Sequence, residues 1–386
     1  MWAKTDACLK CTLCITQCPV MTVNPDFPGP KALGPEWYRQ NQHQTVEATR
    51  HVDDCTFCQL CEQACPVDVP VAHLIAWHKA SQRKPLRLRL RDELLARPHR
   101  AVRWSGAVGL SGSLRKMGGI SQTAHLPRRR RLPAGPLGEP LGSGQGRVGI
   151  FVDCYSASYD ETLAEQAEQL LGLWGYQVTR VPGGSHCCGA AAYAAGNPDL
   201  AQKEARSTWN AVAAFSDVRT IVTLNATCDG TVRDEWPRYF GLELSIPVVP
   251  FDEIALAAPP EFWNRLSGVA ADDRMMAHTT CRGKVARGEG QLAALARRAG
   301  FRVVEPSDAA CCGAAGSYAF KTEHEDTARQ LGARLAEQSS RLGAAGIVTD
   351  SGTCALHIEQ ATQVTTRHPA YWLYRQYQRY LMEGAP

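Results

Sequence analysis

Sixteen cysteines constrain this chain of 386 residues most strongly, because they fall into tight groups separated by long stretches without cysteine. The first eight form the pattern C-x2-C-x2-C-x3-C-P twice, once from Cys8 and again from Cys55. Three thiolates spaced in this way can surround one face of a metal cubane, while the fourth cysteine reaches the neighbouring cluster. The pattern predicts two [4Fe-4S] clusters, one held by Cys8, Cys11, Cys14 and Cys65 and the other by Cys55, Cys58, Cys61 and Cys18.

Zinc is the alternative at these cysteines, since C-x2-C pairs also form tetrahedral thiolate sites. Two complete copies, each ending in Cys-Pro, favour iron-sulfur clusters over zinc. The Leu, Ala and Trp content from Asp68 to Ala80 indicates a helix after the second copy. Residues 1–80 are therefore predicted to form a helical two-cluster ferredoxin-type domain.

The remaining eight cysteines form an internal repeat, which implies two tandem domains of similar fold. Cys154, the Cys187-Cys188-Gly189 triplet and Cys228 recur 124 to 127 residues later. Their counterparts are Cys281, Cys311-Cys312-Gly313 and Cys354. Buried free thiols are the alternative, but chance burial would not repeat three spacings in register. We expect residues 147–262 and 270–386 to form the two domains, each holding one iron-sulfur cluster.

In each repeat the cysteines follow short apolar strands, at Val148–Val152, Met275–Ala277 and the two Ile-Val-Thr segments that end near 223 and 349. Segments of helical period, Glu161–Trp174 and Gln291–Ala299, lie between them. Ligands of such α/β folds bind at the carboxyl ends of parallel strands. The predicted fold is thus α+β and multidomain, with a helical ferredoxin domain followed by two α/β domains. Gly189 and Gly313 fit either a close approach to a cofactor or an ordinary turn.

Residues 81–146 are expected to be a basic linker with amphipathic helices, because 14 Lys or Arg there stand against three acidic residues, while the whole chain has a net charge of +4. Apolar and cationic residues interleave from Pro85 to Ala96, and continue through Val102, Trp104, Val108, Leu110 and Leu114 to the Arg128–Arg131 run. Such a segment can lie on an anionic bilayer, where each basic residue contributes about 1 kcal/mol. It can equally be a solvated linker whose helices pack on the ferredoxin domain or on a partner. Nucleic acid is not an expected partner, since no recognition module accompanies the basic run.

Neither a secretory signal from Met1 to Lys10 nor an apolar run of membrane-spanning length is present. We expect a cytoplasmic protein, with any membrane contact peripheral and on the inner face of the cell membrane.

Two ferredoxin motifs followed by two domains with Cys-Cys-Gly (CCG) signatures resemble the iron-sulfur C subunits of anaerobic glycerol-3-phosphate dehydrogenases. The segment Asn24–Lys31 with Gly34-Pro35 is a specific local match, as are His278–Cys281 and Gly313–Lys321. The same architecture occurs in iron-sulfur subunits of glycolate oxidase and lactate utilisation, and CCG domains occur in heterodisulfide reductase. In that wider family a full CCG domain ends in C-x2-C, whereas Asn225 and Ser351 replace the first cysteine of that pair here.

The resemblance implies an electron-transfer subunit that relays electrons from a flavin dehydrogenase subunit, which oxidises glycerol 3-phosphate, to a membrane quinone. One alternative is a reductase subunit acting on a disulfide or thiol, against which the two missing cysteines argue. Others are an iron-sulfur subunit of a glycolate or lactate oxidase, and a cluster-dependent sensor or scaffold without turnover. No catalytic constellation is found, so the chain is expected to perform no bond-making step of its own. Four thiolates per repeat still suffice for one ordinary cluster. Ser351 is either an oxygen ligand or a polar loop residue.

Three histidines, His186, His278 and His357, lie next to or near the cysteines of the repeats. They are candidates for a role near the clusters or at a quinone site. The alternative is that they are hydrogen-bonded loop residues.

Overall fold

The computed structural model describes residues 4, 6–41, 51–99, 112–124, 134–215, 217–267, 269, 271–306 and 311–383. The chain divides into two compact units. The helical unit comprises Met1–Ala124, Gly189–Glu204 and Ala310–Arg334, and the two-sheet unit comprises the rest. The helical unit's segment Gly189–Glu204 directly follows the paired cysteines of the first repeat, and its segment Ala310–Arg334 contains those of the second repeat.

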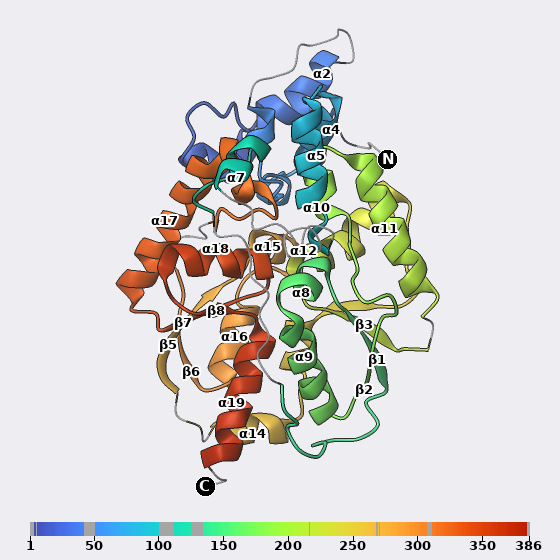
Figure 1. The fold of residues 1–386 in the computed structure, drawn as a ribbon, viewed down its shortest axis with the longest axis vertical. Coiled ribbons are helices and arrows are strands. Elements are labelled where there is room, and N and C mark those ends of the chain that lie inside the picture. The colour runs from blue at the N-terminus through green and yellow to red at the C-terminus, as the bar shows by residue number, and fades with distance from the viewer. Residues whose placement is uncertain are drawn as a thin grey trace. The chain divides into compact units, whose positions relative to one another are not determined.

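The helical unit is built from short helices around the first eight cysteines (Figure 1). One-turn helices α1 (Leu13–Thr16) and α3 (Leu60–Gln63) each begin inside one cysteine motif. The helix predicted after the second motif is α4 (Val71–Ser81), and the start of the basic segment forms α5 (Leu86–Leu95). The other helices of this part are α2 (Trp37–Asn41), α7 (Gly112–Gly118), α10 (Ala190–Ala194), the π-helix η2 (Ala32–Glu36) and the 3-10 turns η1 (Val20–Thr22), η3 (Val52–Asp54), η5 (Tyr318–Phe320) and η6 (Thr322–His324).

The two-sheet unit contains two parallel sheets with the same topology. The first has the order β2-β1-β3-β4, from Gln177–Arg180, Arg147–Phe151, Thr220–Thr223 and Val248–Pro250. The second has the order β6-β5-β7-β8, from Phe301–Val304, Ala271–His278, Gly346–Thr349 and Thr366–Arg367. The central strands are buried on both faces, which explains their continuous apolar runs. The repeat and its α/β class, predicted from the sequence, are confirmed.

Helices cover these sheets and give the two repeats a common core. The predicted helical segments form α9 (Glu161–Leu173) and α16 (Gln291–Arg298), and α9 packs beside α19 (Pro369–Glu383) (Figure 1). Phe262 stacks on Tyr377 with ring centroids 5.5 Å apart, and Trp174 meets Phe262 edge-on at 5.3 Å. In two helices, α11 (Pro198–Ala213) and α17 (Glu325–Leu342), the chain passes from one unit to the other. The remaining helices are α8 (Cys154–Tyr159), α12 (Ala226–Gly230), η4 (Thr231–Phe240), α13 (Phe251–Leu256), α14 (Pro260–Ser267), α15 (Cys281–Arg287) and α18 (Gly352–Thr362).

The domain boundaries at 80, 146, 262 and 270 stay predictions. The apolar and basic side chains expected from Val102 to Leu110 and at Arg128–Arg131 lie outside the described residues, and so does the side chain of Leu114. No helix in the described part of the chain is both long and apolar enough to span a membrane.

Candidate metal centres

The two ferredoxin-type motifs share an unusual backbone conformation. In both copies φ is positive at three positions that are not glycine. One lies four residues before the first cysteine, and the other two lie on either side of the second cysteine. They are Lys4, Lys10 and Thr12 in the first copy and His51, Phe57 and Gln59 in the second. Left-handed backbone at bulky residues is strained, and such strain gathers at functional sites. The matching positions show that both motifs fold into the same loop.

The structure brings Cys65 to the first three cysteines. Burial raises the pKa of the Cys14 thiol, and the neighbouring thiols of Cys8, Cys11 and Cys65 raise it further. Cys11 is exposed, whereas Cys8, Cys14 and Cys65 are partly buried. The backbone N–H of Val69 lies 3.3 Å from Cys65 Sγ and donates to it. These contacts group three cysteines of the first motif with the last cysteine of the second.

The last cysteine of the first motif, Cys18, lies with the first three cysteines of the second motif. A cavity of about 310 Å³ is lined by Cys18 together with Cys55, Cys58 and Cys61. Burial raises the pKa of Cys18 to about 11 and that of Cys61 well above its usual range, and nearby thiols add to both effects. Crowded thiols of this kind lose their protons when a metal binds them.

The four cysteines of the first repeat converge in the two-sheet unit. Cys154 follows β1 at the start of α8, and Cys228 follows β3 within α12. A hydrogen bond with Cys187, together with burial, raises the pKa of Cys154 well above its usual range, and Cys188 acts in the same way on Cys228. The thiols therefore meet at the carboxyl ends of two parallel strands, where the fold class places its ligands.

Asn225, at the position of a missing cysteine, has a structural role. Its side-chain oxygen accepts a hydrogen bond from the Thr227 N–H and caps α12, and its amide lies 3.4 Å from Asp153 Oδ1. Asp153 in turn caps α8 through the N–H groups of Tyr155 and Ser156. The amide thus joins the two loops that carry Cys154 and Cys228. An N-cap preference for Asn just after a strand is a signal that the sequence already contained.

In the second repeat, Cys281 begins α15 after β5 and Cys354 lies in α18 after β7, both in the two-sheet unit. Cys311 and Cys312 are buried and group with the helical unit, where the Gly313 N–H lies 3.4 Å from Cys311 Sγ. Convergence of these four thiols stays a prediction. Ser351 is buried, and its hydroxyl lies 3.3 Å from that of Thr353.

Gly189 is required by packing within the helical unit. Its φ is +91°, and a Cβ there would lie 2.5 Å from the Ala201 carbonyl oxygen. The contact is with the chain itself, so the glycine after this cysteine pair is explained by close backbone approach to α11.

The predicted histidines have identifiable contacts. His186 is buried with Nε2 3.1 Å from the Val181 carbonyl oxygen, and burial lowers its pKa. His278 is buried with Nδ1 3.2 Å from Thr349 Oγ1, and His357 is partly buried on α18. His186 is a hydrogen-bonded loop residue, whereas His278 ends β5 and His357 lies within α18, and a role near a cofactor stays a prediction for all three.

Three residues near Cys55 in the helical unit were not predicted from the sequence. They are Lys79, Tyr318 and Lys321. All three line one cavity of about 320 Å³ together with Cys55 and Asp53. No spacing rule marks these residues, because their proximity arises only from the fold.

The donor set fits iron-sulfur clusters. Each group consists of thiols, which are soft ligands, and a cubane takes one thiolate on each iron rather than several on one ion. Among the described residues, no three Cys, His, Asp or Glu side chains are gathered as ligands of a single metal ion.

Comparison with known proteins identifies the kinds of domain that carry these cysteines. Residues 4–69 match a 4Fe-4S dicluster domain, and residues 148–233 and 275–359 each match a cysteine-rich domain named CCG. The chain is 28% identical to the C subunit of anaerobic glycerol-3-phosphate dehydrogenase of Escherichia coli K12, over 94% of this chain and 96% of the relative. It is 24% identical to the B subunit of fumarate reductase (CoM/CoB) of Methanothermobacter marburgensis, over 93% of this chain and 68% of the relative. It is also 24% identical to the glycolate oxidase iron-sulfur subunit of E. coli K12, over 94% and 91% of the two chains.

Proposed function

Because the chain belongs to the iron-sulfur electron-transfer proteins that join a 4Fe-4S dicluster domain to two CCG domains, we propose that it carries electrons from a flavin dehydrogenase subunit to a membrane quinone. Oxidation of glycerol 3-phosphate is the reaction we assign to the partner. The observation that carries this choice is the similarity to the C subunit of that dehydrogenase, which extends over 94% of this chain.

We assign one [4Fe-4S] cluster to Cys8, Cys11, Cys14 and Cys65, and a second to Cys55, Cys58, Cys61 and Cys18. One further iron-sulfur cluster is assigned to each CCG domain, on Cys154, Cys187, Cys188 and Cys228 and on Cys281, Cys311, Cys312 and Cys354. When bound, such clusters accept and release single electrons.

The chain's own residues supply ligands, exclude water and stabilise negative charge on sulfur. The Phe57 N–H lies 3.5 Å from Cys55 Sγ, and the Val69 N–H lies 3.3 Å from Cys65 Sγ. Hydrogen bonds of this kind raise the reduction potential, because they favour the more negative state.

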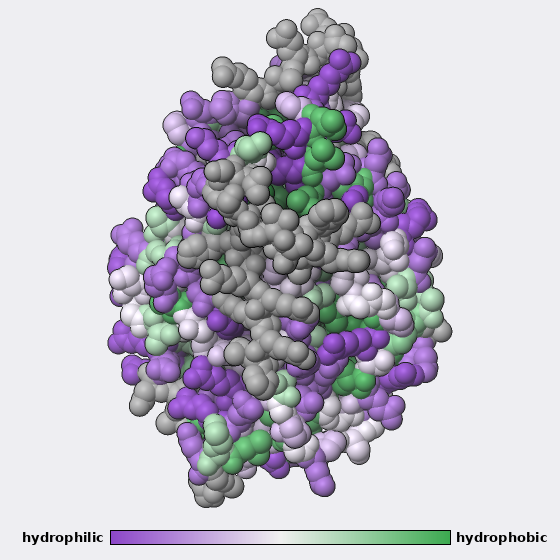
Figure 2. All heavy atoms as spheres, in the orientation of Figure 1, coloured by the Kyte–Doolittle hydropathy of each residue, from purple (hydrophilic) through white to green (hydrophobic). Residues whose placement is uncertain are grey.

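A peripheral contact with an anionic membrane is proposed for α5. Leu86, Leu90 and Leu94 recur every four residues and are 69%, 58% and 38% exposed. Arg87 and Arg89 are exposed beside them. Figure 2 shows apolar side chains gathered where α5 faces the viewer. The inward-facing residues Arg91 and Asp92 are buried instead, so packing accounts for the other side of the helix.

The membrane contact predicts sedimentation with anionic liposomes. Replacing Leu90 and Leu94 with Ser should weaken it at all salt concentrations, whereas neutralising Arg128–Arg131 should weaken it only at low salt. Binding unchanged in both variants would refute the proposal.

A disulfide reductase is the second candidate, favoured by the similarity to the B subunit of fumarate reductase (CoM/CoB). Asn225 argues against it, because its amide is used in capping and cannot replace a thiolate. An iron-sulfur subunit of a glycolate oxidase is the third candidate.

One experiment separates these candidates. The protein is purified with its native partner, and cluster reduction is followed by EPR after adding glycerol 3-phosphate, glycolate, lactate or a thiol. Reduction by glycerol 3-phosphate alone is expected. Reduction only by another substrate would assign the chain to the corresponding alternative.

Iron and sulfide counts on Cys188→Ser and Cys312→Ser variants test the CCG clusters, and unchanged counts and spectra in both variants would refute them.

A further inference from the structure

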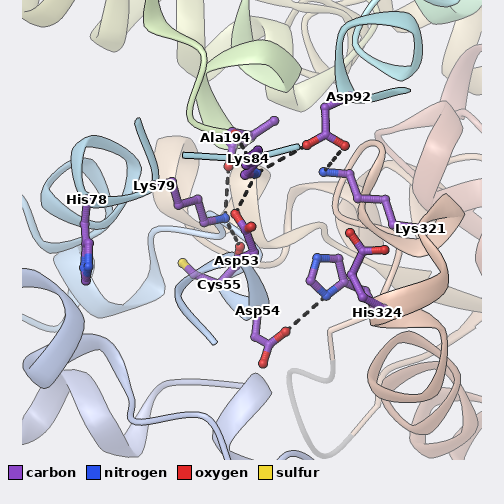
Figure 3. Close-up of polar contacts among 12 residues, drawn as sticks. Asp53, Asp54, Cys55, His78, Lys79, Lys84, Asp92, Ala194, Lys321 and His324 are labelled. Atoms are coloured by element: carbon purple, nitrogen blue, oxygen red, sulfur yellow. Dashed lines mark hydrogen bonds and ion pairs between the residues drawn. The ribbon is translucent and has the colours of Figure 1, made fainter. Parts of the chain in front are cut away.

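Lys79 on α4 places a buried ammonium group against the loop that carries Cys55. The residue is 4% exposed, and its Nζ donates to the carbonyl of Cys55 at 2.7 Å and to that of Ala194 at 3.0 Å (Figure 3). Both acceptors are neutral. Lys79 also lowers the pKa of the Asp53 carboxyl, but that carboxylate is paired directly with Lys84 at 2.9 Å, so the charge of Lys79 is only partly compensated and still acts on other groups nearby.

The chain holds this ammonium group firmly in place. Gly196 has φ +79°, and a Cβ there would lie 2.6 Å from Lys79 Cβ, so the backbone after α10 presses directly on the lysine. Earlier on α4, His73 Nδ1 lies 3.3 Å from the Tyr193 hydroxyl. The segment that follows the first paired cysteines thus fixes Lys79 over Cys55.

Two neighbouring lysines are paired directly with carboxylates. Lys321 lies 3.1 Å from Asp92 Oδ1, and Lys84 lies 2.9 Å from Asp53 Oδ1 (Figure 3). Lys79 instead donates directly to the Cys55 carbonyl and is buried, so its ammonium group is the cation placed against the loop that carries Cys55.

The first cysteine group lies in a different environment. Burial and the neighbouring thiols raise the pKa of Cys14, and Cys11 is exposed to solvent. Lys31, which acts on Cys8 and Cys14, is paired with Glu36 at 2.9 Å. Arg39, which donates to the Cys8 carbonyl at 3.1 Å, is likewise paired with Asp6, and pairing and solvent weaken the effect of both cations.

Resting on the cluster assignment of the proposed function, we propose that Lys79 is a positioning residue that raises the reduction potential of the site formed by Cys18, Cys55, Cys58 and Cys61 above that of the site at Cys8. Reduction adds one negative charge to a site, and a fixed cation in a buried environment favours that state. When the two ferredoxin-type sites hold one electron between them, that electron therefore resides mainly at the site that contains Cys55.

The test is a redox titration of the full-length protein, followed by EPR. In Lys79→Gln the amide can still donate a hydrogen bond while the charge is lost. We expect the ratio of reduced to oxidised site at a given potential to fall about tenfold at one ferredoxin site only, which is about 59 mV for one electron. Lys79→Arg keeps the charge and should restore the potential. Both ferredoxin potentials unchanged in Lys79→Gln, or an equal fall in Lys79→Arg, would overturn the inference.

Asp53→Asn provides a test of opposite sign that does not depend on how Lys79→Gln folds. Asp53 opposes negative charge at Cys55, so its neutralisation should raise the potential of the same site, and by less because the carboxylate is 36% exposed. A fall or no change would contradict the inference. Absence of ferredoxin-type signals from the reduced, unsubstituted protein would instead overturn the proposed function together with it.

Discussion

The Asn225 amide lies 3.4 Å from Asp153 Oδ1, and each of these residues caps the helix that carries one cysteine of the first repeat. The pair therefore connects the loops that carry Cys154 and Cys228, which are far apart in the sequence. It also explains how a polar residue can replace a cysteine of the wider family without leaving a hole in the site.

Replacing Asn225 with Ala should lower the free energy of unfolding by about 1 kcal/mol, the usual effect of losing an N-cap. Iron and sulfide content should stay unchanged, because Asn225 is not among the assigned ligands. Urea unfolding and iron analysis check the two parts of this prediction. Asn225→Ser, which can still cap the helix without placing a second carboxylate beside Asp153, is the matched control. Loss of iron from Asn225→Ala with intact stability would show that the residue is a ligand.

Arg287 joins the two repeats within the two-sheet unit. Its guanidinium lies 3.0 Å from Asp229 Oδ2 and 2.8 Å from Asp350 Oδ2, all three side chains being at most 5% exposed. Arg287→Met should lower the free energy of unfolding by about 3–5 kcal/mol, because it leaves buried carboxylates without their cation. The exposed pair of Arg238 and Asp234 supplies the control, since Arg238→Met should cost less than about 1 kcal/mol. Equal effects in urea unfolding would contradict this view of Arg287.

Asp92 should make the stability of the helical unit depend on pH. Burial alone raises the pKa of Asp92, but Lys321, Lys84 and Arg91 outweigh it and hold the pKa below the usual value of 3.8. A folded-state pKa below the unfolded value stabilises the protein above about pH 4, and that contribution is lost as the pH falls through the folded pKa.

Asp92→Asn should therefore destabilise the protein by about 2 kcal/mol at pH 7, and the difference should shrink below about pH 4. Calorimetry of both proteins between pH 7 and 3.5 measures the difference. Asp217→Asn, which alters an ion pair whose carboxylate is 83% exposed, is the control and should have little effect at any pH. A difference that grows on acidification would show the opposite sign.

Regular elements could be predicted because their signals are local. Val148 to Val152 predicts β1 to within one residue, and Glu161 to Trp174 predicts α9 equally well. The contact of Lys79 with Cys55 and Ala194 could not be predicted, because it joins segments separated by up to 115 residues. No periodicity or spacing encodes such a contact. The cap at Asn225 lies between these cases, since Asn directly after a strand is a local N-cap signal, although the cysteine pattern alone predicts only a missing ligand there.

The exchange of fourth ligands between the two ferredoxin sites can be tested by two single substitutions. Cys18 lines the cavity of Cys55, Cys58 and Cys61, whereas Cys65 acts on Cys14. Cys65→Ser should therefore impair the site at Cys8, Cys11 and Cys14, although Cys65 belongs to the other motif. Cys18→Ser should impair the site at Cys55, whose potential Lys79 is proposed to raise.

The two variants are distinguished by the potential of the ferredoxin signal that remains intact. In Cys65→Ser the intact signal should have the higher potential and should still shift when Lys79→Gln is added. In Cys18→Ser it should have the lower potential and should not respond to Lys79→Gln. Cys354→Ser, outside both motifs, should leave both ferredoxin signals in place. If Cys65→Ser instead removed the signal that responds to Lys79, each motif would supply all four ligands of its own cluster.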